Sequence, residues 1–211
     1  MSTETDSPAT ASGAATRPAR QWGKTERTRR VILDAARDVF IAEGYNDANI
    51  AHIVERSGLS VGSVYHHFNG KADLFLALWS EFEAVYSEAA AKAVADARHS
   101  GVTDPVELFL AGSRGYLEVA RHNSKLTLLF RGGDGPPGYD ALGTDVGEAW
   151  AKNNLTLLGL EDNTTNRLRV RILIRVVVEG ESAIARAKRK SEVEPIIAET
   201  LAIIRRIATV D

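Results

Sequence analysis

Apolar residues recur along this chain of 211 residues at intervals of three and four, which is the period of an amphipathic α-helix. The first such stretch predicts a helix from about Thr25 to Glu43, and Gly44 is expected to end it. The apolar positions that define this helix are Ile32, Ala35, Ala36, Val39 and Phe40. Together they form one face that can pack on the segment that follows.

Two shorter helices joined by a tight turn are expected next. Asn49 can cap the first helix by accepting a free backbone N–H group, and Gly58 can supply the left-handed conformation that ends it. Ser60 is a second N-cap, and the helix after it is expected from about Val61 to Phe68. This arrangement is a helix-turn-helix, whose second helix has the size to enter a DNA major groove. Helix pairs with a glycine turn also occur in all-α proteins that bind no DNA.

A long helix is expected from about Lys71 to Arg98, where the sequence contains neither Gly nor Pro. At roughly 1.5 Å per residue it would extend some 40 Å, enough to link the N-terminal helices to a second domain. One of its faces carries the aromatic residues Phe75, Trp79, Phe82 and Tyr86. Such a stripe is more often part of a core than of a binding site, so both interpretations stay open.

The remaining segments also predict helices. They are expected from Asp104 to about Arg121, at Leu126–Phe130, from about Tyr139 to Leu158, from Asp162 or Thr164 past Gly180, and from a capping box at Ser191–Glu194 onward. Between them, residues 131–138 are too rich in Gly and Pro to be helical, and they form either a plain connector or a mobile lid beside a pocket.

The predicted fold is therefore all-α, with about nine helices. Residues 21–71 would form a helix-turn-helix DNA-binding domain of three helices, and residues 72–211 a helical domain for ligand binding and dimerisation. Residues 1–20 consist mainly of Ser, Thr, Ala and Pro, and they are expected to be a disordered tail because they contain too little apolar surface to bury.

Several short motifs in the N-terminal third carry a resemblance to a known family. They are Gly44-Tyr45, Gly58-Leu59-Ser60 and the run from Gly62 to Phe68, followed by Lys71 and Leu74. Over about residues 25–75 the sequence resembles the TetR family of bacterial transcriptional regulators. The resemblance implies a homodimeric repressor that binds a palindromic operator in double-stranded DNA and is released by a small, largely apolar effector.

Carried over position by position, the resemblance implies a role for each residue of the helix-turn-helix. Tyr65, His67 and Lys71 would hold phosphates. The candidates for base contact are Val61, Gly62, Ser63 and His66, with Asn49 and Ser60 at the helix starts. Family members often have Lys or Arg where Val61 stands. Val61 offers only methyl groups, which suit the C5-methyl group of thymine.

The same resemblance implies a cavity and a subunit interface in the C-terminal domain. The expected cavity residues are Trp79, Phe82, Tyr86, Phe109, Gly112, Tyr116, Phe130 and Trp150, with Gly112 leaving room beside the aromatic rings. A filled core is the alternative. The last two helices have broad apolar surfaces, and the residues predicted at the dimer interface are Ile172, Val176, Ile203, Ile204 and Ile207.

The charge distribution supports contact with nucleic acid at one end of the chain. The formal net charge is −2, but residues 17–71 hold nine Lys and Arg against six Asp and Glu, whereas residues 72–211 hold seventeen against twenty. The basic residues that lead into the first helix are Arg17, Arg20, Lys24, Arg27, Arg29 and Arg30. They either solubilise the tail or form an arm that reaches the DNA backbone or minor groove.

Other functional classes are disfavoured. The chain has no cysteine, and its five histidines do not have metal-ligand spacing, so no metal and no cofactor is expected. No apolar run reaches the length of a membrane span and no secretory signal is evident, which predicts a cytoplasmic protein. A small helical enzyme that uses the aromatic pocket and a nonspecific DNA-binding protein are the alternatives. The first lacks a nucleophile–His–acid arrangement, and the acidic body disfavours the second.

Overall fold

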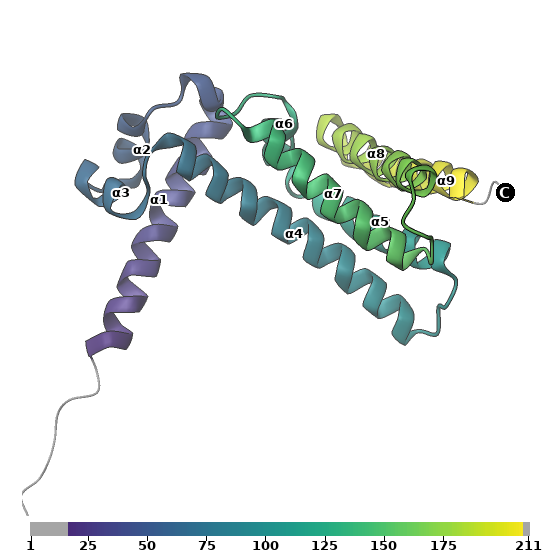
Figure 1. Cartoon of the computed structure of the whole chain (residues 1–211). Coiled ribbons are helices and arrows are strands. Elements are labelled where there is room, and N and C mark those ends of the chain that lie inside the picture. Colours follow the sequence, from purple (N-terminus) through teal and green to yellow (C-terminus); the bar gives the residue numbers. More distant parts are fainter. Residues whose placement is uncertain (1–16, 209–211) are drawn as a thin grey trace, which may run out of the picture.

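A computed structural model describes residues 17–208, with side chains described from residue 25 (Figure 1). Over this range the chain forms nine α-helices and one short 3-10 turn, without a strand, so the all-α prediction is confirmed. The helices are α1 Arg17–Asp47, α2 Ile50–Ser57, α3 Val61–His67, α4 Lys71–His99, α5 Pro105–Ala120, α6 Ser124–Arg131, α7 Tyr139–Leu157, α8 Thr164–Arg186 and α9 Val193–Ala208; the 3-10 turn is Lys190–Glu192.

The first three helices form a compact head at one end of α4 (Figure 1). The predicted caps are confirmed: Asn49 Oδ1 accepts the backbone N–H of His52 at 3.0 Å, and Ser60 Oγ accepts that of Ser63 at 3.1 Å. Gly58 ends α2 with φ 67°, a conformation that favours glycine. These caps define the ends of the two helices, because each provides a hydrogen-bond partner for a backbone group that has none within the helix.

The first helix is longer than predicted. It begins at Arg17, inside the segment that was expected to be disordered, and the rest of that segment, residues 1–16, lies outside the described residues. The side chains of Arg17, Arg20 and Lys24 also lie outside the described part, so the predicted role of the basic arm stays a prediction at those positions. Near its end, α1 is interrupted at Gly44, which has φ 78° and ψ 175°.

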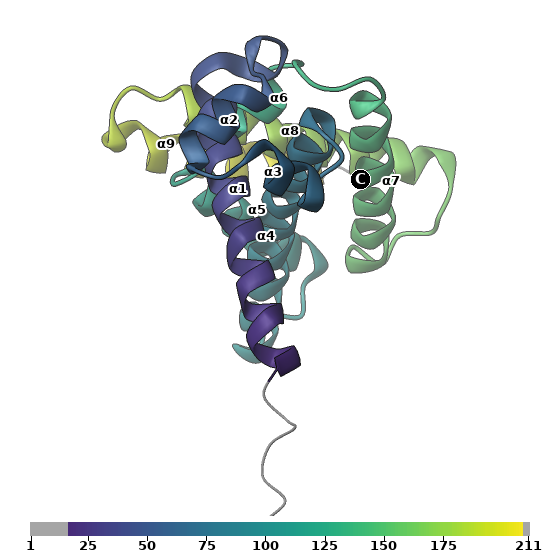
Figure 2. The same cartoon turned by 90° about the vertical axis from the view of Figure 1, so that its left-hand side faces the viewer.

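The helices of the body are arranged along α4. The α5 helix packs on α4, and α8 and α9 pack against each other far from α3 (Figures 1 and 2). Figure 2 shows α7 standing to one side of the α4–α5 pair, where it contacts α8. No helix within residues 17–208 is long and apolar enough to cross a membrane.

One continuous core joins the head to the body. Phe75 of α4 lies at its centre, with ring centroids 5.5 Å from Phe40, 5.0 Å from Tyr45, 5.1 Å from Phe130 and 5.3 Å from Tyr139. The first two residues belong to α1, and the last two belong to α6 and α7. Buried aromatic contacts therefore cross the domain boundary predicted at residue 71. Through them, a displacement of the body can move the head.

Candidate DNA-contacting helix and effector cavity

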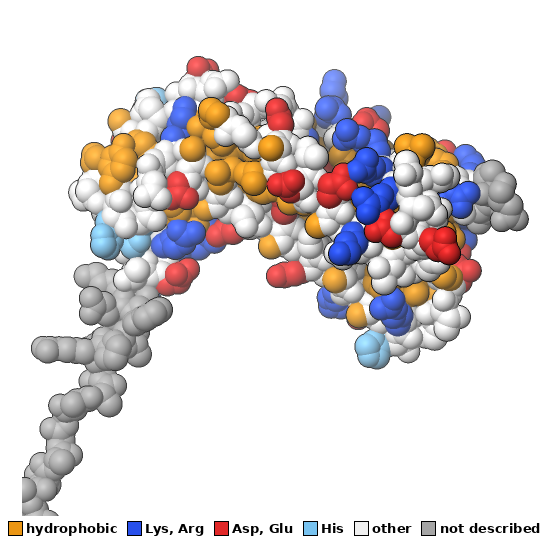
Figure 3. All heavy atoms as spheres, in the orientation of Figure 1, with side chains coloured by type: hydrophobic (Ala, Val, Ile, Leu, Met, Phe, Trp, Pro, Cys, Tyr) orange, Lys and Arg blue, Asp and Glu red, His pale blue; other side chains and the backbone are white. Residues whose placement is uncertain are grey.

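The outer face of α3 is exposed at the end of the head. Val64 is buried beneath it, whereas Val61, Gly62, Tyr65 and His66 face solvent, and Tyr65 is 55% exposed. Figure 3 shows hydrophobic and histidine side chains gathered on this end of the molecule. Of the other residues predicted to contact DNA, Asn49 and Ser60 are exposed at their helix starts, and Ser63 and His67 are half-buried. The fold thus brings eight of the nine predicted DNA-contacting residues to helices α2 and α3.

Lys71, the ninth, has a different role from the one expected. Its Nζ atom donates hydrogen bonds to the backbone carbonyls of Tyr45 at 2.7 Å, Ala48 at 2.9 Å and Asn46 at 3.1 Å. The ammonium group also lies 4.4 Å from the centroid of the Tyr45 ring. Since an ammonium has three N–H donors, all of them are used within the chain. In this structure Lys71 therefore closes the carbonyl end of α1, and its implied phosphate contact stays a prediction.

Two other basic residues of the head are also engaged internally. The Arg29 guanidinium lies 4.4 Å from the centroid of the Phe68 ring, and Arg30 forms an ion pair with Glu81 of α4 at 2.9 Å. Both residues belong to the predicted basic arm. In the structure they brace α1 against the end of α3 and against α4, and they are not extended toward a ligand.

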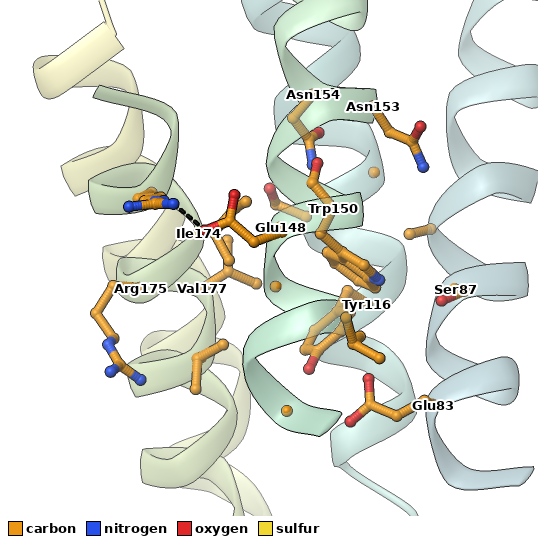
Figure 4. A pocket seen from close by; sticks show the side chains of 18 of the residues that line it. Glu83, Ser87, Tyr116, Glu148, Trp150, Asn153, Asn154, Ile174, Arg175 and Val177 are labelled. Atoms are coloured by element: carbon orange, nitrogen blue, oxygen red, sulfur yellow. Dashed lines mark hydrogen bonds and ion pairs between the residues drawn. The ribbon is translucent and has the colours of Figure 1, made fainter. Parts of the chain in front are cut away.

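A cavity of about 1000 Å³ lies in the body between α4, α5, α7 and α8 (Figure 4). Six of the eight residues predicted for it line it: Trp79, Phe109, Gly112, Tyr116, Phe130 and Trp150. Phe82 and Tyr86 do not line it, and their prediction is wrong. Both are buried behind the cavity wall, where their ring centroids lie 4.5 Å apart. Residues 79, 82 and 86 share one broad helix face, but only Trp79 on its edge faces the open space.

Gly112 lines the cavity for a different reason from the one predicted. A Cβ atom at this position would lie 2.9 Å from Val94 Cγ2 of α4, and one at Gly115 would lie 2.7 Å from the Ala89 carbonyl oxygen. The two glycines therefore allow α5 to approach α4 closely. The space that Gly112 leaves is occupied by α4, and it does not enlarge the cavity.

A cluster of polar side chains lies at the end of the cavity nearest α6. Glu181 of α8 is fully buried and accepts hydrogen bonds from Tyr116 Oη at 2.9 Å, Arg131 Nε at 3.2 Å and Thr127 Oγ1 at 3.4 Å. Arg131 Nη2 also lies 3.1 Å from Glu83 Oε1 of α4. Figure 4 shows Glu83 extending toward Tyr116 and Trp150. The guanidinium of Arg131 thus forms ion pairs with two carboxylates, those of Glu83 and Glu181.

Burial shifts the pKa values of this cluster. It raises the pKa of Glu83 above its ordinary value more strongly than Arg131 lowers it, and the nearby Glu181 adds to the rise. Burial also raises the pKa of Tyr116 well above its ordinary value, so this side chain stays protonated and donates to Glu181. Burial alone would lower the pKa of Arg131, but Tyr116, Glu181 and Glu83 together raise it, so Arg131 stays charged.

Sequence reasoning missed this cluster, although a signal for it exists. Glu83 lies four residues after Trp79, and Glu181 lies four residues after Val177, so each acid interrupts an apolar helix face. An isolated acid on such a face requires a buried partner. The partner, Arg131, begins the glycine-rich segment that was considered only as a connector or lid.

In sequence, the chain is similar to known proteins over the head of the molecule. Residues 32–78 match the family described as bacterial regulatory proteins, tetR family. Over this segment the chain is similar to the TetR family. It is 44% identical over 55 residues to the HTH-type transcriptional regulator SrpR of Pseudomonas putida, and 40% identical over 65 residues to the HTH-type transcriptional repressor AcnR of Corynebacterium glutamicum. These matches cover 26% and 31% of this chain, and 26% and 35% of the respective relatives.

Over the whole chain, the similarity to solved structures is one of fold. A solved TetR-family transcriptional regulator from Syntrophomonas wolfei superposes with a TM-score of 0.69 at 18% identity, covering 88% of this chain and 96% of that one. An N-terminal helix-turn-helix followed by a helical body is therefore shared, while the cavity and its polar cluster are described by this chain's own residues.

The loop before α7 connects the cavity to the TetR-type head. Asp134 Oδ2 accepts the backbone N–H groups of Tyr45 at 3.0 Å and Asn46 at 3.3 Å, and its Oδ1 accepts the Asn46 side-chain amide. A Cβ atom at Gly44 would lie 3.1 Å from Asp134 Oδ2. Gly44 therefore permits this close approach in addition to its positive φ. The neighbouring Gly133 lines the cavity.

Helices α8 and α9 carry the residues predicted at the subunit interface. Ile172 is 45% exposed on α8, and Val176, Ile203 and Ile207 are half-buried. Ile204, in contrast, is fully buried among the chain's own helices. A residue that is already covered cannot contact a second subunit, so the assignment of Ile204 to the interface is wrong. The interface itself stays a prediction at the other four positions.

Proposed function

We propose that this chain is a transcriptional repressor that binds operator DNA as a homodimer and is released when a small molecule occupies the cavity. The observation that carries this proposal is the physical continuity between the cavity and the helix-turn-helix. Phe130 and Tyr139 line the cavity and also contact Phe75, which packs on Phe40 and Tyr45 of the head. A ligand between these elements therefore acts on the base of α1.

The exposed face of α3 supports DNA binding through the major groove. Val61 and His66 lie on the solvent side of the helix, where they can face base edges, and Tyr65 and His67 can reach the phosphates beside them. With Lys71 used internally, this face has few cationic groups. Affinity would then depend strongly on the remaining basic residues of α1, and base preference on van der Waals contact and histidine hydrogen bonds.

A homodimer would place two such helices on one operator. Two recognition helices about 34–36 Å apart can occupy successive major grooves of a palindrome. The exposed apolar residues Leu168 and Ile172 on α8 support a subunit interface there, because an uncovered apolar surface favours association.

Release by a ligand would follow from linkage. If the cavity is filled best when the α6–α7 segment is displaced, Asp134 and Phe130 move with it, and the end of α1 moves in turn. A ligand that binds better to this displaced form lowers DNA affinity by the same factor by which DNA lowers ligand affinity.

The test is a gel-shift titration of the full chain against the DNA upstream of its own gene and against random DNA, repeated at several salt concentrations. A regulator keeps its preference for one site at physiological salt, whereas a nonspecific DNA-binding protein shifts both DNAs alike. Absence of any shift would contradict the proposal and favour an enzyme that uses the cavity. Tyr65→Ala serves as the matched variant because this exposed side chain can be removed without opening the core.

A further inference from the structure

The buried end of the cavity holds more negative than positive charge. Glu83 and Glu181 share the single guanidinium of Arg131. Glu181 is fully buried and receives three hydrogen bonds, so its charge is well compensated. The excess negative charge therefore resides on Glu83.

Glu83 is only partly compensated by the protein itself, through Arg131 and the Trp79 side chain. Arg131 Nη2 lies 3.1 Å from Glu83 Oε1, close enough for an ion pair, but its geometry is not that of a hydrogen bond. Oε1 is buried and has no hydrogen-bond partner, while the side chain as a whole is 13% exposed, toward the cavity. A carboxylate in this state is destabilised relative to one in water, and a cation or an N–H donor in the cavity would relieve the deficit.

The surroundings of Glu83 suit an organic cation better than a hydrated inorganic ion. The aromatic residues that also line the cavity include Trp79, Tyr116, Phe130, Tyr139 and Trp150. Two pairs among them meet edge to face: Trp79 with Tyr139 at 5.7 Å and Tyr116 with Trp150 at 5.2 Å between ring centroids. Aromatic faces attract cations electrostatically and at the same time bury apolar groups attached to the charge.

The charges at the rim are of both signs and do not offset this preference. Arg98, Asp140 and Arg175 are exposed, and Arg171 forms an ion pair with the exposed Glu148 (Figure 4). Water and salt screen such groups strongly, whereas a charge at the buried end is screened much less. The carboxylate of Glu83 therefore dominates the potential where a ligand would be most enclosed.

We infer that the cavity binds an organic cation with aromatic or branched apolar substituents, and that Glu83 is its counter-ion. This inference rests on the proposed effector-binding role of the cavity and names the chemistry of the ligand. The cationic centre would lie between Glu83 and the aromatic rings, and its substituents would extend toward Phe109 and Val177.

The test compares two probes of nearly the same size and shape but opposite charge, tetraphenylphosphonium and tetraphenylborate. Binding to the full chain is measured by calorimetry at about pH 8, because burial raises the pKa of Glu83 above its ordinary value and a high pH favours its ionised form. The inference predicts that the phosphonium binds at least about tenfold more tightly than the borate. Equal affinities, or tighter binding of the borate, would overturn it.

Two variants test whether Glu83 causes the preference for the cationic probe. Glu83→Gln keeps the shape of the side chain and should lower the affinity for the phosphonium about tenfold while leaving borate binding unchanged or stronger. Glu88→Gln removes the same charge from an exposed position on α4 and should change neither affinity. An undiminished preference in Glu83→Gln would refute the role of Glu83. If this variant did not fold, the comparison of the two probes on the unaltered chain would still decide the charge preference.

The same samples separate this inference from the proposed function. A chain that binds its upstream DNA selectively but shows no preference for the phosphonium would retain the regulatory proposal and lose the cationic ligand. A chain that prefers the phosphonium through Glu83 but binds no DNA would retain the cationic ligand and lose the regulatory proposal.

Discussion

Lys71 offers the sharpest test of the structure, because the family resemblance and the structure imply different contacts for its ammonium group. The resemblance implies a contact to DNA phosphate, whereas the structure directs its three N–H donors to the carbonyls of Tyr45, Asn46 and Ala48. The informative change is Lys71→Met, which keeps the length and apolar stem of the side chain and removes only the ammonium group.

The expected loss of stability follows from these contacts. A hydrogen bond that involves a charged group contributes about 1.5–3 kcal/mol, but three bonds from one half-buried ammonium are not additive. Two of the acceptors, the carbonyls of Tyr45 and Ala48, are partly buried and would lose their partner without full access to water. We therefore expect the free energy of unfolding to fall by about 2–4 kcal/mol, which corresponds to roughly 5–15 °C in Tm for a chain of this size.

The assay combines urea unfolding without DNA and a salt titration of operator binding. Lys92→Met is the control, because Lys92 forms an exposed ion pair with Asp96 that should contribute at most about 1 kcal/mol. The slope of log affinity against log salt should stay the same in Lys71→Met. Unchanged stability together with a slope reduced by about 0.9, the value for one lost phosphate contact, would refute the internal role.

Three further predictions concern the coupling, the cavity and the dimer. Asp134→Ala should leave operator affinity within about threefold of the unaltered chain but reduce the effect of tetraphenylphosphonium on it, because the loop would lose its hydrogen bonds to the head; a gel shift with and without the probe measures this, and an unchanged response would contradict it. Glu83→Gln should raise Tm near pH 8 and not near pH 4, since the raised pKa of Glu83 means that folding favours its protonated form and that this contribution to stability is lost as pH rises through the folded-state pKa; equal Tm differences at both pH values would argue against it. Ile172→Glu should dissociate the dimer in sedimentation velocity, whereas Leu142→Glu, a comparably exposed site on α7, should not; an intact dimer in the first variant would exclude α8 from the interface.

The sequence by itself determined the helices and their order. Apolar periodicity predicted the helix from Thr25 onward and those of the body, and the caps at Asn49, Ser60 and Asp104 marked where helices begin. These signals are readable because they act within one or two turns of the chain. The family motifs added the helix-turn-helix and its exposed face on the same local basis.

Only the tertiary structure decided what several side chains contact. Lys71 meets a carbonyl 26 residues earlier in the chain, and Asp134 meets the backbone of Asn46 at a separation of 88 residues. Helical periodicity can show that Ile204 and Ile172 both lie on apolar faces, but it cannot show that Ile204 is covered by its own chain while Ile172 is 45% exposed. In the same way, it places Tyr86 and Trp79 on one stripe without showing which of them borders the cavity.

The buried charges show the physical reason most clearly. Glu83, Arg131 and Glu181 come from α4, α6 and α8. The sequence places the two acids on apolar helix faces, but it does not show that Arg131 lies between them. Their charge becomes costly only when the three helices converge and exclude water, because the cost of a charge depends on the medium around it. The sequence pattern indicates which residues are apolar, whereas the packing of the helices determines how far each charged group is removed from water.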